Sequence, residues 1–154
     1  MEIKKCVKES FSVIGKEGST NDGEGFIQRL WSDANSNFNE VASLAKKDER
    51  GNLLGIWGAM SDFSRSFSPW EDGFTKGLYL AGVEVVETAQ APTGWVKWTV
   101  PSYEYVYAKN EGQGIFTDVM EFLNSNNIEL AGAAHDFSSP EDGQGYIFFP
   151  IRKL

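Results

Sequence analysis

Apolar residues recur at intervals of three and four positions in two stretches of the chain, which is the spacing of one face of an α-helix. The first stretch has its apolar stripe at Phe26, Leu30, Ala34, Phe38, Val41 and Ala45. It ends near Lys46 and Lys47, whose positive charges suit the C-terminus of a helix. The second, shorter stretch has its stripe at Ile115, Phe116, Val119, Phe122 and Leu123. Residues 124–127 then stop it, so the sequence predicts two helices.

Apolar and alternating segments, typical of β-strands, surround both predicted helices. They lie at residues 6–14, 53–60, 77–86, 95–100, 103–107, 128–134 and 146–151. The tyrosines of segment 103–107 repeat with a period of two, which places Tyr103, Tyr105 and Tyr107 on one side of the strand. Pro101 and Ser102 predict a hairpin turn between this strand and the preceding one.

A short motif occurs twice, once before each predicted helix. It reads Asn, acid, Gly, polar, Gly, apolar at residues 21–26 and again at residues 110–115. Because helix N-termini favour anions, a phosphate-binding loop is one interpretation, but the Lys-Ser/Thr pair of such loops is missing. Glycine turns together with Asn or Asp caps explain both copies fully. The motif therefore marks the start of each helix.

The order strand, helix, strand, strand occurs twice, with an extra strand at residues 95–100 before the second copy. This order predicts an α+β fold that is built from a duplicated strand–helix–strand–strand module. We expect an antiparallel sheet with two helices on one face and a ligand groove on the other, since grooves between pseudo-symmetric halves commonly bind ligands. The halves, at about 1–88 and 94–154, should share one core, because a half of roughly 75 residues is marginal alone.

The composition is that of a globular protein, with 41% hydrophobic and 23% charged residues. A formal net charge of -8 argues against direct nucleic-acid binding, which needs a basic patch. Because Cys6 and His135 are the single cysteine and histidine, we expect neither an internal disulfide nor a metal site, and no cofactor is implied. No apolar run is long enough to span a membrane, and the N-terminal residues do not resemble a secretory signal. The sequence therefore predicts a cytoplasmic protein.

Aromatic residues near acids are the main candidates for ligand binding. Glu84 alternates onto an otherwise apolar strand face, where it is either an edge charge that opposes aggregation or a group that faces a cleft. Trp57 is flanked by glycines, and Trp70 follows a proline in a loop that could act as a lid. Core packing is the alternative explanation for each aromatic residue. Aromatic rings beside acids would instead suit flat or cationic ligands.

His135 and Asp136 precede two serines, which suggests nucleophilic catalysis at first sight. Adjacent residues on a strand point to opposite faces, and no Gly-x-Ser-x-Gly motif is present. A serine hydrolase is therefore not favoured. Asp136 is better explained as a single acid that lines a pocket.

Residues 78–85 and 100–107, together with the duplicated element order, resemble the GyrI-like family. That family includes the effector-binding domains attached to AraC-type and MerR-type transcription regulators. The resemblance covers nearly the whole chain and implies a stand-alone domain over residues 1–154, with a central groove for lipophilic, often cationic compounds. It also implies an acid followed by an aromatic residue on a late strand, matched here by Asp136 and Phe137, with aspartate replacing the usual glutamate. The candidate ligand-binding residues are thus Trp57, Trp70, Tyr79, Glu84, Tyr105, Asp136 and Phe137.

Three functions remain as hypotheses. The leading one is a small-molecule-binding domain that senses or sequesters lipophilic, aromatic or cationic compounds. The same resemblance implies an alternative, a hydrolase of strained, cyclopropane-type electrophiles with Asp136 or Glu84 as general base. The third is a protein-interaction role such as inhibition of gyrase. The expected partner is a small molecule, a protein partner or a homodimer stays open, and DNA binding would need a separate protein.

Overall fold

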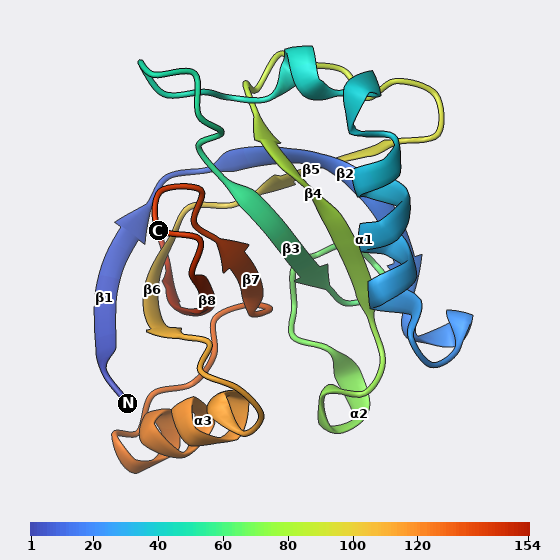
Figure 1. The fold of residues 1–154 in the computed structure, drawn as a ribbon. Helices are drawn as coiled ribbons and strands as arrows, with labels where there is room; N and C mark the ends of the chain where they lie inside the picture. Colours follow the sequence, from blue (N-terminus) through green and yellow to red (C-terminus); the bar gives the residue numbers. More distant parts are fainter.

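A computed structural model describes residues 1–154 and contains one eight-stranded sheet in which all neighbouring strands are antiparallel (Figure 1). The strands are β1 Ile3–Lys8, β2 Phe11–Ser19, β3 Ile56–Ser61, β4 Leu78–Val85, β5 Val96–Val100, β6 Tyr103–Lys109, β7 His135–Ser138 and β8 Gly145–Lys153. The helices are α1 Phe26–Ser36, α2 Glu71–Phe74 and α3 Ile115–Ser125. No helix is both long and apolar enough to cross a membrane. The predicted α+β class and antiparallel sheet are confirmed.

Two strand–helix–strand–strand units follow each other along the chain, as predicted. The first is β2-α1-β3-β4 and the second is β6-α3-β7-β8. Gly25 and Gly114 precede α1 and α3 with φ angles of 75° and 94°, a left-handed conformation that glycine adopts without steric cost. Neither helix has a side-chain cap at this position. The repeated motif therefore reflects the backbone freedom of glycine, and the predicted Asn or Asp caps are wrong for these two helices.

The sheet is curled, so that strands from its two ends approach each other. The strand order is β1-β6-β8-β7-β3-β4-β2-β5, yet β1 continues into β2 and β5 continues into β6. The backbone N–H of Ser10 donates to Ser102 Oγ at 2.8 Å and ties these two connections together. The predicted hairpin at Pro101 and Ser102 is wrong, because β5 pairs with β2 while β6 pairs with β1 and β8. This connection instead carries the chain from one end of the sheet to the other.

The two long helices cover the same face of the sheet, called the helical face below. On β4, Tyr79 and Ala81 belong to the core under α1, whereas Leu78 and Leu80 point to the opposite face. That opposite face, called the aromatic face, carries the buried cluster Phe11, Val13, Trp57, Ala59, Leu78, Leu80, Trp98, Val100, Tyr103, Tyr105 and Phe148. The alternation predicted for residues 77–86 and for the three tyrosines of β6 agrees with this arrangement.

Several predicted elements differ from the structure. The single strand predicted at 6–14 is two strands, β1 and β2, which lie near opposite ends of the sheet. Helix α1 ends at Ser36, and the rest of the predicted stripe forms 3-10 turns at 38–40 and 42–44. Asn37 ends the helix because its side-chain Nδ2 donates to the Asp33 carbonyl oxygen at 3.0 Å. The predicted strand at 128–134 is irregular, since its backbone pairs with scattered groups, for example Ala133 N–H with the Phe67 carbonyl oxygen at 2.8 Å.

Candidate functional site

The floor of the candidate site is the seam between β3 and β7 on the helical face. Ile56, Gly58 and Met60 alternate onto this face from β3. Asp136 of β7 lies opposite Gly58 in the strand register. Ala134 lies two residues before Asp136, just before β7 begins, and so points to the same face. The floor therefore has a carboxylate at its centre and apolar residues at both ends.

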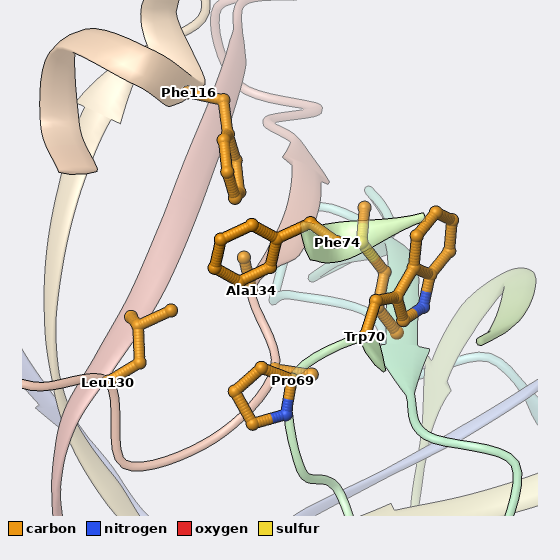
Figure 2. A pocket seen from close by; sticks show the side chains of 8 residues that line it. Pro69, Trp70, Phe74, Phe116, Leu130 and Ala134 are labelled. Carbon is orange, nitrogen blue, oxygen red and sulfur yellow. The ribbon is translucent and has the colours of Figure 1, made fainter. Parts of the chain in front are cut away.

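An apolar cavity of about 200 Å³, called the α3 cavity below, lies at one end of this floor between α2 and α3. It is lined by Met60, Pro69, Trp70, Phe74, Phe116, Leu130, Ala133 and Ala134. Figure 2 shows these side chains gathered around one space, with Pro69 and Trp70 coming from the loop before α2 and Phe116 from α3. Phe74 and Phe116 pack edge to face with ring centroids 5.1 Å apart. Phe74 is 40% exposed, so this wall opens to solvent.

A second apolar cavity of about 260 Å³, called the α1 cavity, lies beneath α1 at the other end of the floor. Its walls include Trp31 and Ala34 of α1, Ile56 of β3 and the indole of Trp95. Lys16 Nζ lies 4.3 Å from the centroid of the Trp95 ring. Gly58, the register partner of Asp136, therefore lies between the β3 residues that line the two cavities.

A chain of hydrogen bonds joins Trp31, which lines the α1 cavity, to Asp136 of the floor. Trp31 Nε1 donates to Tyr79 Oη at 3.1 Å, and Tyr79 Oη donates to Asp136 Oδ2 at 3.0 Å. Gly58 leaves room for this chain, because a Cβ atom there would lie 1.8 Å from Tyr79 Oη and 3.2 Å from Asp136 Cβ. The Tyr79 phenol therefore lies across Gly58, and its hydroxyl group joins α1 to β7.

The carboxylate of Asp136 has no basic partner. No lysine, arginine or histidine lies within ion-pair distance of it. Its Oδ1 atom accepts no hydrogen bond from the chain and is not sealed from solvent. Burial raises the pKa of Asp136, while the hydrogen bond from Tyr79 acts in the opposite direction. A partly buried carboxylate of this kind gains most from a cation that replaces its lost hydration.

Four of the predicted ligand-binding residues lie on the aromatic face instead. Trp57 is 2% exposed and packs against Phe137 with ring centroids 4.6 Å apart. Glu84 accepts a hydrogen bond from Trp57 Nε1 at 3.0 Å and pairs with Lys8 Nζ at 3.3 Å and Lys46 Nζ at 3.5 Å. It lies on β4, inside the sheet between β3 and β2, so the edge-charge interpretation of Glu84 is wrong. Its carboxylate is fully engaged by the chain itself.

Tyr105, the fourth of these residues, is fully buried in the same aromatic interior, where it packs against Phe148, and His135 packs there against Trp57. Neither Tyr105 Oη nor His135 Nε2 has a hydrogen-bond partner. The other ring nitrogen, His135 Nδ1, accepts the backbone N–H of Met60 at 3.0 Å. The sequence analysis placed the groove on this face, whereas both apolar cavities lie on the helical face. The curled sheet explains the difference, because aromatic side chains from both of its ends meet and fill the interior.

Trp70, Tyr79 and Asp136 are the predicted residues that the structure brings to the groove. Trp70 Nε1 donates to the carbonyl oxygen of Leu78 at 2.9 Å, so the indole is a fixed wall rather than the predicted lid. Sequence reasoning missed Trp31 and used Phe116 only as part of a helix stripe. The sequence could have identified Trp31 by its position directly after the stripe residue Leu30, because that position places an indole N–H at the edge of the buried helix face.

Comparison with models of known protein families gives no match, and neither does comparison with curated proteins. Solved structures do match. SAV2435 bound to tetraphenylphosphonium is 16% identical with a TM-score of 0.64, over 99% of this chain and 94% of that one. The EcmrR C-terminal domain is 12% identical with a TM-score of 0.61, over 99% and 98% of the two chains. A hydrolase from Listeria innocua is 11% identical with a TM-score of 0.52, over 97% and 91%.

Identities this low establish a common fold and nothing further. The similarity spans nearly the full length of both chains in each case. It agrees with the duplicated strand–helix–strand–strand architecture that the sequence predicted. The chain therefore has the fold of these structures.

Proposed function

We propose that this chain binds a lipophilic aromatic cation in the groove along the β3–β7 seam and so senses or sequesters it. The observation that carries the proposal is the carboxylate of Asp136, which lacks a basic partner and whose register partner Gly58 lies between the β3 residues that line two apolar cavities. The apolar walls favour ligands that leave water, at roughly 25 cal/mol for each Å² of apolar surface buried. The carboxylate of Asp136 and the ring of Trp31 add attraction for a positive charge.

The solved structures support this proposal at two levels. SAV2435 was crystallised with tetraphenylphosphonium, a cation surrounded by four phenyl groups. EcmrR, whose C-terminal domain has the same fold, is also known in a complex with DNA. The same fold thus occurs in a protein bound to a lipophilic cation and in a protein that forms a complex with DNA. The net charge of -8 makes direct DNA binding by this chain unfavourable, so its proposed partner is the small molecule.

Replacing Asp136 with Asn should weaken binding of tetraphenylphosphonium by about tenfold to a hundredfold, because the counter-charge is lost from a partly buried site. Binding can be followed by quenching of tryptophan fluorescence, since Trp31 and Trp70 line the groove. Triphenylphosphine oxide, a neutral analogue, should bind the wild-type chain and the variant equally. Because burial raises the pKa of Asp136, acidification should also weaken cation binding before it would at an exposed aspartate.

Two control substitutions separate the groove from the rest of the acidic surface. Asp118→Asn removes an exposed carboxylate of α3, and Glu84→Gln neutralises the carboxylate that Lys8 and Lys46 already engage. Both variants should keep the affinity of the wild-type chain for tetraphenylphosphonium. A loss of affinity in Glu84→Gln but not in Asp136→Asn would show that the cation binds on the aromatic face instead. Absence of any saturable response to tetraphenylphosphonium in the wild-type chain would refute the proposed function.

Hydrolysis of a strained electrophile is a second candidate, favoured by the common fold with the Listeria innocua hydrolase. Asp136 Oδ1 is free to take a proton from an attacking water, whereas Glu84 is held by its lysine partners. We expect binding without turnover, because burial raises the pKa of the Tyr79 phenol, the titratable group hydrogen-bonded to Asp136, and makes it a poor proton donor to a leaving group. Chromatography after incubation with a cyclopropane-containing alkylating agent tests this. If product forms with the wild-type chain and not with Asp136→Asn, hydrolysis replaces binding as the proposed function.

A further inference from the structure

We propose that the groove accepts a ligand with two apolar ends, in which one cationic centre is flanked by two uncharged aromatic groups about 13 Å apart. This inference rests on the proposed function and specifies the class of ligand. It starts from the strand geometry of the floor. Ile56 lines the α1 cavity and Met60 lines the α3 cavity. The four residue steps between them span about 13 Å, at roughly 3.3 Å for each residue of a strand.

The charge of such a ligand would lie at the middle of this span. Gly58 is the midpoint of the β3 segment, and Asp136 is its partner in the register. The free Oδ1 atom of Asp136 and the Trp31–Tyr79 hydrogen bond form the one polar strip between two apolar walls. A ligand that is polar at its centre and apolar at both ends matches this order.

Each cavity is large enough for one aromatic ring. An enclosed apolar cavity of about 150 Å³ suffices to bind benzene, and the two cavities measure about 200 Å³ and about 260 Å³. A compact ligand that fills one of them leaves the other unused. The second cavity is therefore a separate source of affinity for a ligand that reaches across Asp136.

The ends of the ligand should carry no positive charge. The α1 cavity is bounded by Trp95, and Lys16 Nζ already lies 4.3 Å from the centroid of that ring. A second cation against the same ring would be repelled by the lysine. The α3 cavity offers no acid among its lining residues, which are aromatic or aliphatic. One central charge with neutral ends is thus the pattern that the groove favours.

Three ammonium ions test this inference by calorimetry: bis(phenylpropyl)dimethylammonium, the one-ended phenylpropyltrimethylammonium, and the short dibenzyldimethylammonium, whose rings cannot span both cavities. The two-ended ion should bind the wild-type chain about tenfold or more tightly than either of the others, since it buries one additional ring. Equal affinities for the two-ended and one-ended ions would overturn the inference. It would leave the proposed function intact, provided that Asp136→Asn still weakens all three.

Two matched cavity-filling variants locate the ends. Ala34 lines the α1 cavity and Ala134 lines the α3 cavity, and each is 6% exposed. Ala34→Leu or Ala134→Leu should each remove the advantage of the two-ended ion while changing the one-ended ion little, because that ion can use the other cavity. Asn35→Trp, at an exposed position on the rim of the α1 cavity, gives the same test without altering the core. If the advantage survives both α1-cavity variants, the second end does not lie there and the inference fails. If no ion binds the wild-type chain, the proposed function fails with it.

Discussion

Acidification from pH 6.5 towards pH 4 is expected to destabilise the folded chain by about 1.4 kcal/mol for each pH unit once His135 titrates in the unfolded state. His135 is the single histidine of the chain and is 1% exposed. Its burial lowers its pKa to about 3. Between pH 6.5 and about 3, the unfolded chain therefore binds one more proton at this position than the folded chain does. Because the unfolded state gains the proton, the free energy of unfolding falls as the pH falls.

Two carboxylates define the pH window in which this effect can be isolated. Burial opposes ionisation of Asp62, but hydrogen bonds from Ser64, Ser66 and Ser61 outweigh it and lower its pKa to about 2. The stability that Asp62 contributes is present above pH 3.8 and is lost only below it. Asp136, whose pKa is raised by burial, acts in the opposite direction, because its folded form takes up a proton first. Measurements between pH 7 and about 4.5 therefore report mainly on the histidine.

Urea unfolding of the wild-type chain and of His135→Gln over this range tests the expectation. The glutamine does not titrate, and its side-chain oxygen can still accept the backbone N–H of Met60 that His135 Nδ1 accepts. The substitution also changes the packing of a buried side chain, so the slope of the unfolding free energy against pH is the quantity to compare. We expect the free energy of unfolding to fall more steeply with falling pH in the wild-type chain than in the variant, since the Asp136 contribution is common to both. Equal slopes in the two proteins would show that His135 is not protonated on unfolding.

The two faces of the strands could be predicted from the sequence, because they follow from the alternation of neighbouring residues along each strand. Alternation at residues 78–85 correctly separated Tyr79 from Leu78 and Leu80, and the tyrosines of β6 followed the same rule. The repeated Gly-x-Gly motif marked both helix starts because it reflects a backbone conformation. The end of α1 was less predictable, since the apolar stripe continues through 3-10 turns that pack on the same core.

The position of the groove could not be predicted, because it depends on contacts between distant segments. Nothing in the local pattern shows that the sheet curls until its two ends, β1 and β5, approach each other, which fills the aromatic face. Glu84 and Asp136 look alike in the sequence, each an acid on a strand. Glu84 is engaged by Lys8 and Lys46 from two other segments, whereas Asp136 has no such partner. The resemblance to a known family identified Asp136 as a candidate, and the geometry gives its surroundings.

Gly58→Ala is expected to destabilise the chain by about 1–3 kcal/mol and to abolish cation binding at micromolar concentrations. The new methyl group would lie 1.8 Å from Tyr79 Oη and 2.5 Å from Tyr79 Cζ, so the phenol must leave its place across the strand. Tyr79 is 1% exposed, and its movement disturbs the core under α1. It also breaks the hydrogen bonds to Asp136 and from Trp31, which shape the centre of the groove. Thermal unfolding and titration with tetraphenylphosphonium measure the two effects.

A double-mutant cycle shows whether the clash with Tyr79 is the cause. In a Tyr79→Leu background the phenol is absent, so adding Gly58→Ala should cost much less than it does in the wild-type chain. Gly145→Ala is a suitable strand control, because its added methyl group would meet no atom closer than 3.8 Å. If Gly58→Ala costs the same in both backgrounds, strain in β3 itself limits the position. A large loss in the wild-type background alone would show that this glycine is present to let Tyr79 reach the carboxylate of Asp136.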